Sequence, residues 1–156
     1  MTRKVILLVE DNPDEQVLTQ MALNKIDQAH EVVVVNDGVE ALDYLFGVGT
    51  YAGRDPAIAP HLILLDLKLP RLDGLEVLRR MRSDPRTALL PVVVLTTSNE
   101  DQDLIDSYRL GANSYVCKPV DFGQFVQAVH QLGRYWLVWN EIPPVQVGWE
   151  NSENPE

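Results

Sequence analysis

The feature that most constrains the fold is a regular alternation of two kinds of segment along the chain. Short apolar runs, typical of strands buried on both faces, alternate with longer segments whose apolar residues recur every three or four positions, as in amphipathic helices. The predicted strands are at residues 4–9, 31–35, 62–65, 91–96 and 114–117. This alternation favours parallel strands joined by right-handed crossovers, with helices on both faces. The sequence therefore predicts an α/β fold with a doubly wound, five-stranded parallel sheet.

The first predicted helix has the clearest start signal. Asn12 is a good N-cap residue, Pro13 suits the first helical position, and Glu15 stands three residues after the cap. We expect the apolar face of this helix to consist of Val17, Leu18, Met21, Ala22 and Ile26. The same spacing predicts four more helices. One follows Gly38, one ends near Ser83, one begins at Glu100 and one begins at Phe122.

Three segments do not fit the alternation. Residues 47–60 contain three glycines and two prolines without apolar periodicity, which predicts a surface loop inserted between a helix and a strand. Residues 135–145 are rich in aromatic and aliphatic side chains, and we expect them to form an apolar extension after a domain at residues 1–134. Residues 146–156 are polar and acidic and are predicted to be disordered.

Composition narrows the class of function. Acidic residues outnumber basic ones by ten among 156 residues, which argues against nonspecific binding to DNA or to an anionic membrane. The apolar run after the N-terminal basic residues is too short for a signal peptide or a membrane span. The single cysteine, Cys117, cannot form an intramolecular disulfide and is expected to be a small buried apolar residue. A cytoplasmic location is expected.

Polar residues follow the predicted strands where each strand ends. Glu10 and Asp11 follow the first, Asp66 follows the third, Thr96 closes the fourth and Lys118 follows the fifth. In a doubly wound sheet these ends meet at the ligand-binding edge. Three carboxylates in one place demand a cation, and oxygen ligands suit Mg²⁺. A hydroxyl and an ammonium beside them can hold a phosphoryl group, and Asp66 can act as the nucleophile that receives it.

Each of these residues also has a simpler interpretation. Asp66 alone could cap a turn, and Glu10 and Asp11 could stabilise the following helix through its dipole. An aromatic residue in a strand, such as Tyr115, is usually a packing residue. The histidines have no ligand spacing and are interpreted as surface or packing residues. It is the combination of polar residues at matching strand ends that favours a functional site.

The residues at the strand ends resemble a known family when they are taken in order. Over residues 4–133 the chain is similar to the receiver domain of two-component response regulators. The motifs that carry this similarity are Glu10-Asp11, Leu-Leu-Asp66-Leu-Lys-Leu-Pro, Leu-Thr96-Thr and Tyr115-Val-Cys-Lys118-Pro119. The resemblance implies a flavodoxin-like receiver fold with strand order 2-1-3-4-5. It also implies a phosphoacceptor with self-catalysed phosphotransfer and dephosphorylation, not a turnover enzyme.

The resemblance assigns a role to each matching residue. Asp66 would accept a phosphoryl group from a kinase phosphohistidine, and Thr96 and Lys118 would bind its oxygens. Mg²⁺ would be held by Glu10, Asp11, Asp66 and the backbone carbonyl of Lys68.

The remaining matches concern the surroundings of that site. Tyr115 would be the aromatic switch that turns inward on phosphorylation. Lys68 and Ser98 would tune the lifetime of the phosphoryl group. The peptide bond before Pro119 would be cis.

No DNA-binding or enzymatic output domain is expected after the fifth helix. With its apolar extension and its 47–60 loop, the chain is similar to the single-domain regulators of cyanobacterial and bacterial phytochrome histidine kinases. This similarity implies a phytochrome-type kinase as partner and a homodimer formed through the extension. The residues expected in the interface are Trp136, Leu137, Trp139 and Ile142. The extension could instead fold back over its own domain.

The leading hypothesis is thus a stand-alone regulator that is phosphorylated on Asp66 and signals through protein contacts. An alternative is a phosphorelay shuttle that passes its phosphoryl group to a histidine phosphotransfer protein. A third possibility is a Mg²⁺-dependent phosphohydrolase that works through an aspartyl phosphate. That class needs a second acid shortly after the nucleophile, and Lys68 stands two residues after Asp66.

Overall fold

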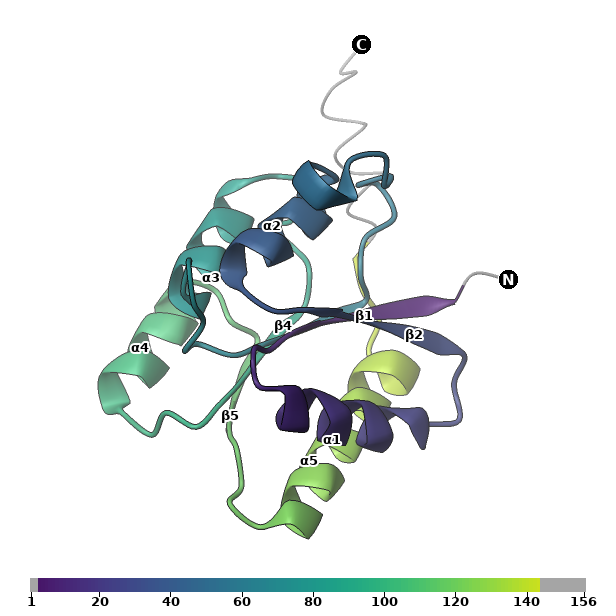
Figure 1. The fold of residues 1–156 in the computed structure, drawn as a ribbon, viewed down its shortest axis with the longest axis vertical. Coiled ribbons are helices and arrows are strands. Elements are labelled where there is room, and N and C mark those ends of the chain that lie inside the picture. Colours follow the sequence, from purple (N-terminus) through teal and green to yellow (C-terminus); the bar gives the residue numbers. More distant parts are fainter. Residues whose placement is uncertain (1–2, 144–156) are drawn as a thin grey trace.

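The computed structural model describes residues 3–143 and contains one parallel sheet with helices on both sides (Figure 1). In chain order the strands and α-helices are β1 (Lys4–Val9), α1 (Pro13–Asn24), β2 (His30–Val35), α2 (Gly38–Phe46), β3 (Leu62–Leu65), α3 (Gly74–Ser83), β4 (Val92–Thr96), α4 (Asp101–Arg109), β5 (Ser114–Cys117) and α5 (Phe122–Arg134). The five strands pair in the order β2-β1-β3-β4-β5, and every pair is parallel. The predicted doubly wound fold is confirmed.

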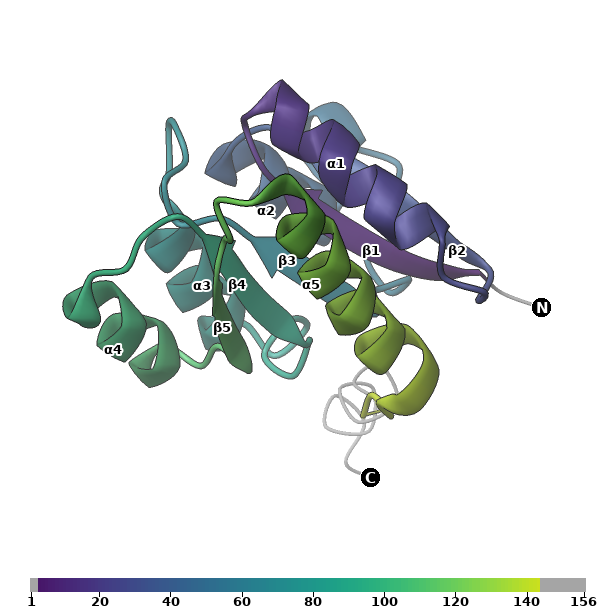
Figure 2. The ribbon, with the colours of Figure 1, turned by 90° about the horizontal axis from the view of Figure 1, so that it is seen from below.

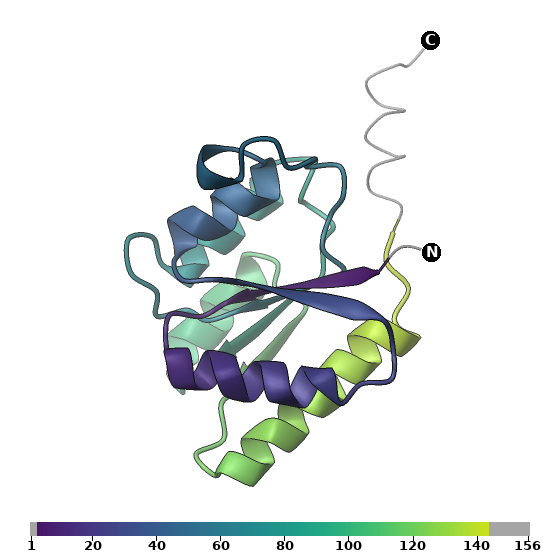
Figure 3. The ribbon, with the colours of Figure 1, turned by 45° about the vertical axis from the view of Figure 1, so that its right-hand side comes forward.

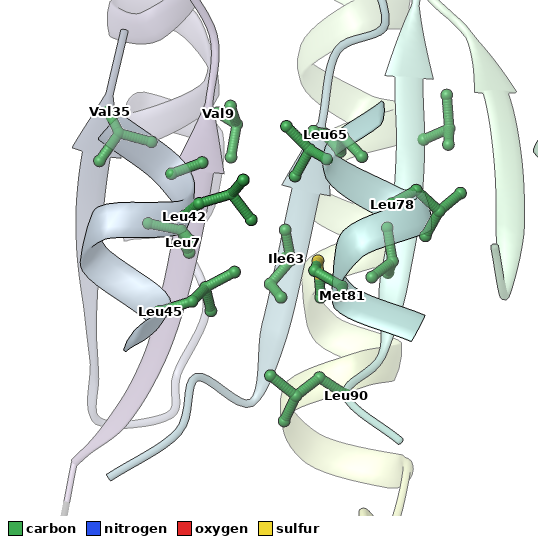
Figure 4. Packing of buried hydrophobic residues seen from close by; sticks show 14 of the residues in the cluster. Leu7, Val9, Val35, Leu42, Leu45, Ile63, Leu65, Leu78, Met81 and Leu90 are labelled. Carbon is green, nitrogen blue, oxygen red and sulfur yellow. The ribbon is translucent and has the colours of Figure 1, made fainter. Parts of the chain in front are cut away.

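The helices divide between the two faces of the sheet. Helices α1 and α5 lie side by side on one face, and α2, α3 and α4 lie on the other (Figure 2). Successive side chains of a strand point to opposite faces, so Leu7 packs toward α2 and α3 while Leu8 packs toward α1 and α5. Figure 4 shows Leu42 of α2 and Leu78 of α3 packed against the strands on the first of these faces. Both faces of the central strands are therefore buried, as their apolar runs predict.

Helix α1 begins where the sequence predicts, but only part of its predicted apolar face is buried. The Asn12 side chain accepts hydrogen bonds from the backbone of Asp14 and Glu15, as expected of an N-cap. Ala22 and Ile26 are buried as predicted, but Val17 and Met21 are exposed, and Thr19 and Leu23 are buried instead. Neighbouring stripes on a helix share the same three- and four-residue spacing. Which of these stripes lies in the middle of the buried face is decided by the contacts of α1 with the sheet and α5, and the spacing alone does not specify them.

The 47–60 segment packs against α2. Its 3₁₀ turn, Gly49–Tyr51, places the Tyr51 hydroxyl where it donates a hydrogen bond to Glu40. Arg54 donates to the backbone carbonyl of Tyr44 and places its guanidinium 3.9 Å from the centre of the Tyr44 ring. The segment is thus fixed to the surface of α2 by polar and cation–π contacts.

The chain after α5 continues as a π-helical turn, Tyr135–Trp139. Leu137 is fully buried in the core cluster between the sheet, α1 and α5. Its carbonyl accepts a hydrogen bond from the Lys4 ammonium, so this turn lies at the end of the sheet where β1 begins (Figure 3). Trp139 is 67 % exposed.

The burial of Leu137 corrects its predicted place in a dimer interface. This side chain fills the core of its own domain and has no surface to offer to a second chain. Residues 144–145 of the predicted extension and the predicted disordered tail, 146–156, lie outside the described residues.

The expected cis peptide bond before Pro119 is also wrong. Over residues 3–143 no peptide bond is cis, so Lys118 is joined to Pro119 by the trans form, which X–Pro bonds favour energetically. In the same part of the chain no helix has the length and apolar character needed to cross a membrane.

Candidate functional site

The polar residues predicted at the strand ends lie together at the carboxyl edge of the sheet. β1 and β3 are neighbours with Val9 opposite Leu65, which places Glu10 beside Asp66. Thr96 closes β4, the strand on the other side of β3. Glu10 and Asp66 are only 4 % and 7 % exposed, and Thr96 is fully buried. Parallel pairing of central strands therefore brings these side chains into one buried site.

Lys118 is at the centre of this site. Its ammonium donates a hydrogen bond to the Glu10 carboxylate at 2.6 Å and to the Asp66 carboxylate at 3.1 Å. It also donates to the carboxylate of Glu15, which reaches in from the first turn of α1. The side chain of Lys118 is 3 % exposed, so the ammonium depends on these three acids in place of water.

Glu15 is the member of this site that the sequence interpretation missed. The pattern around Asn12 explained Glu15 as a first-turn acid of a helix, and that interpretation is sufficient in itself. Its signal as a site residue is its place in the first helical turn after a strand end, and that turn brings the side chain to the site only if α1 begins over the strand ends. That orientation belongs to the fold and cannot be read from the segment.

The charges at the site do not balance. Three carboxylates face one ammonium, and burial raises the pKa of Glu10 to about 7, even though the hydrogen bond from Lys118 opposes the rise. Burial disfavours the charged form of Lys118, but its hydrogen bonds to Glu10 and Glu15 and the nearby Asp66 raise its pKa above the ordinary value. Oxygen atoms of Glu10, Glu15 and Asp66 lie within 4.8 Å of one another. This set of hard oxygen donors with excess negative charge fits a divalent cation.

Two of the predicted metal ligands stand apart from this group. Asp11 is exposed and is not among the acids whose oxygens come within 4.8 Å of one another in the described part of the chain. Lys68 donates its backbone N–H to the Asp66 carboxylate at 3.3 Å, while its side chain points to Asp103, with 3.7 Å between the ammonium and the carboxylate. The roles of Asp11 and of the Lys68 carbonyl stay predictions.

Thr96 and Tyr115 are linked through the loop after β4. The Thr96 hydroxyl accepts a hydrogen bond from the backbone of Ser98 at 3.3 Å. The Tyr115 hydroxyl donates to the Ser98 carbonyl at 3.0 Å, and burial raises the pKa of Tyr115. The Ser98 hydroxyl in turn donates to Asp103 of α4. A displacement of Thr96 would therefore reach both Tyr115 and α4 through one residue.

Cys117 corrects a further expectation. It was predicted to be a small buried residue, but it is exposed, with its sulfur 3.5 Å from the Ser98 carbonyl. The reason is its place in the sheet, since β5 is an edge strand and Cys117 is its last residue.

Comparison with known proteins agrees with this geometry. The family model of the response regulator receiver domain matches residues 6–130 of this chain. Response regulator Rcp1 from Synechocystis is 39 % identical over 140 residues, which are 90 % of this chain and 93 % of Rcp1. The crystal structure of the Mn²⁺-bound form of Rcp1 aligns with a TM-score of 0.84 at 38 % identity, over 90 % of this chain and 99 % of that one.

Two solved structures of phytochrome response regulators are also similar. The phosphorylated cyanobacterial phytochrome response regulator RcpA has 44 % identity and a TM-score of 0.85, over 91 % of this chain and 99 % of RcpA. The bacteriophytochrome response regulator AtBRR has 51 % identity and a TM-score of 0.70, over 90 % of this chain and 100 % of AtBRR. The site, the sheet order and these matches together show that the chain belongs to the response regulator receiver domain family.

Proposed function

We propose that this protein is a stand-alone response regulator that accepts a phosphoryl group on Asp66 from the phosphohistidine of a sensor histidine kinase. The observation that carries the proposal is the buried Asp66 carboxylate, hydrogen-bonded to Lys118 at the carboxyl edge of the sheet, beside two further acids. Such a group is a nucleophile with an electrostatic partner already in place. The protein then acts as a phosphoacceptor switch, not as a turnover enzyme.

The transfer follows from the groups at the site. An oxygen of Asp66 attacks the phosphorus, the phosphorus–nitrogen bond breaks, and its electron pair stays on the imidazole nitrogen. The Lys118 ammonium and the Thr96 hydroxyl bind the oxygens of the transferred group. Glu10, Asp11, Asp66 and the Lys68 carbonyl would hold Mg²⁺, which supplies positive charge to offset that of the phosphoryl group.

The loop after β4 is the proposed route by which phosphorylation changes the surface of the protein. In the proposed switch, Thr96 moves toward the phosphoryl group and Tyr115 turns inward, which changes the surface of α4, β5 and α5. The hydrogen bond from Tyr115 to Ser98 supports the coupling of the ring to the loop that carries Thr96, and in this structure the ring already packs against the core.

The proposed kinase is of the phytochrome type. RcpA and AtBRR, both phytochrome response regulators, align with nearly the whole described chain. DNA is not a proposed partner, because the net charge of −10 would repel its phosphates. The cytoplasmic location stays a prediction from composition.

A homodimer through the C-terminal turn is also proposed, now on its exposed residues. Tyr135, Val138 and Trp139 offer apolar surface to a partner, whereas Leu137 does not. Light scattering on Trp139→Ala should show a loss of dimer. A truncation after Arg134 would be a poor test, because it removes the buried Leu137 as well.

The two alternatives gain no support. Nothing in the sequence matches or in the site favours a phosphorelay shuttle over a terminal switch. For the phosphohydrolase, the position of the required second acid holds Lys68, whose ammonium faces Asp103.

The test is phosphotransfer from a labelled phytochrome-type kinase to the full chain. Wild-type protein should take up label only with Mg²⁺ present, and Asp66→Asn should take up none. Asp101→Asn, which removes an exposed carboxylate from α4, is the matched control and should label normally. Label that remains on Asp66→Asn would place the phosphoacceptor elsewhere.

A further inference from the structure

Glu15 has no role yet in the proposed function, although it binds the same ammonium as Asp66. Its place is well defined, because its backbone N–H is capped by the Asn12 side chain and its carboxylate accepts a hydrogen bond from Lys118. The Glu15 side chain is 27 % exposed, against 5 % for that of Glu10. It is therefore the acid of this site that lies nearest to solvent.

Lys118 has no donor to spare. An ammonium has three N–H donors, and here they face three acceptors, on Glu10, Glu15 and Asp66. A phosphoryl oxygen on Asp66 can bind the ammonium only by displacing one of these acceptors.

Of the three acids, Glu15 is the one that can give way most easily. Glu10 is buried and also accepts a hydrogen bond from the backbone of Asn12 at 3.1 Å, and Asp66 would itself carry the phosphoryl group. Glu15 lies on the surface of a helix turn, where its carboxylate can rotate into water without an unpaired charge being left in the core.

The charge of Glu15 also has opposite effects on the two ligands of the site. A carboxylate at this position attracts a cation and repels a phosphoryl dianion. We propose that Glu15 is a positioning residue that holds Lys118 in the unphosphorylated protein, which favours the cation and opposes the phosphoryl group until Lys118 is released. This inference rests on the proposed function and adds a regulatory residue to it.

The experiment compares two ligands on the full-length protein. Calorimetry measures the affinity for Mg²⁺ alone, and then the affinity for beryllium fluoride, a phosphoryl mimic, at saturating Mg²⁺. For Glu15→Gln we expect Mg²⁺ to bind about fivefold more weakly and beryllium fluoride about fivefold more tightly, since one partly screened charge is removed.

The matched control is Asp14→Asn. It removes one negative charge from the adjacent residue of the same helix turn, and Asp14 is exposed and has no ion pair among the described residues. We expect its two affinities to stay within about twofold of wild type. Glu15→Asp keeps the carboxylate and should lie between Glu15→Gln and wild type, and thermal melts show that each variant is folded.

Three results would overturn the proposal. Equal changes in Glu15→Gln and Asp14→Asn would show a general charge effect. Weaker binding of both ligands would show that Glu15 only supports the local structure. If wild-type and Asp66→Asn proteins bound beryllium fluoride alike, the proposed function itself would fail, and this inference with it.

Discussion

Two lysines stand at opposite ends of the same sheet and differ in what they bind. Lys118, at the carboxyl edge, donates hydrogen bonds to three carboxylates in a buried site. Lys4, at the start of β1, donates to one backbone carbonyl, that of Leu137 in the C-terminal turn. In our proposal the contact of Lys118 with Glu15 is exchanged for one with a phosphoryl oxygen, whereas the contact of Lys4 with the Leu137 carbonyl is structural.

The two ends of the sheet therefore have different roles: the carboxyl edge holds the groups of the proposed chemistry, and the opposite edge holds structural contacts. The carboxyl edge concentrates negative charge that a bound cation or a proton on Glu10 can balance, so its stability depends on ions and pH. The opposite edge is closed by apolar burial, which is insensitive to both. The four predictions below test this separation, from the largest expected effect to the smallest.

Leu137→Ala tests the apolar edge. Removal of a fully buried leucine side chain should lower the free energy of unfolding by about 3 kcal/mol, because it leaves a cavity between α1, α5 and the sheet. Urea denaturation with and without Mg²⁺ should give the same loss. Gln127→Ala, at an exposed position of α5, should change the unfolding free energy by at most about 0.5 kcal/mol.

Lys118→Met tests the charged edge. Three acids would lose their counter-charge, and we expect a loss of about 2 kcal/mol in EDTA, less than for a closed ion pair because Glu10 can take up a proton. Mg²⁺ should restore much of this loss. Lys68→Met removes an exposed ammonium and is the control. An equal loss in the two variants would contradict the central position given to Lys118.

Glu10→Gln tests the pH dependence of the charged edge. In the folded protein without metal the pKa of Glu10 is about 7, against 4.5 for an ordinary glutamate, so the folded state holds the proton more tightly between these values. The wild-type unfolding free energy should therefore fall as pH rises from about 4.5 to 7, relative to Glu10→Gln, by an amount on the order of 1 kcal/mol. Denaturation in EDTA at about pH 4 to 8 measures it. Parallel pH courses for the two proteins would contradict the raised pKa.

Lys4→Met should have the smallest effect. It removes one hydrogen bond from the half-buried Lys4 ammonium, whose place water can take, and we expect a loss of about 0.5 kcal/mol that does not change with Mg²⁺. Lys25→Met, at an exposed lysine that follows α1, is the control. A Mg²⁺-dependent loss in Lys4→Met would mean that the two edges are coupled.

Much of the charged edge was predictable from the sequence because strands fix it. Glu10, Asp66, Thr96 and Lys118 each follow or close an apolar run, and parallel pairing must bring such ends together. Glu15 was not predictable in the same way, because its side chain reaches the site only through the angle at which α1 begins over the sheet.

The apolar edge was less predictable because its backbone departs from the usual helix. In the π turn the Asn140 backbone donates to the Tyr135 carbonyl, five residues back, which changes the direction of every side chain between them. The spacing of Trp136, Leu137 and Trp139 therefore did not indicate which of them is buried. The insertion at residues 47–60 is a similar case, since its attachment to α2 depends on a contact between its own Arg54 and the Tyr44 ring of α2, which no local spacing indicates.

The position of the C-terminal turn determines what the intrinsic fluorescence of the protein can report. Of its three tryptophans, Trp136 and Trp139 lie in or beside this turn, and Trp149 lies outside the described residues. Asp66 is at the other end of the strands, and β1 alone spans roughly 20 Å between the two edges. Emission from Trp136 and Trp139 will not sense a phosphoryl group by direct contact. A spectral change from these two indoles on phosphorylation would therefore measure a signal that has travelled the length of the sheet.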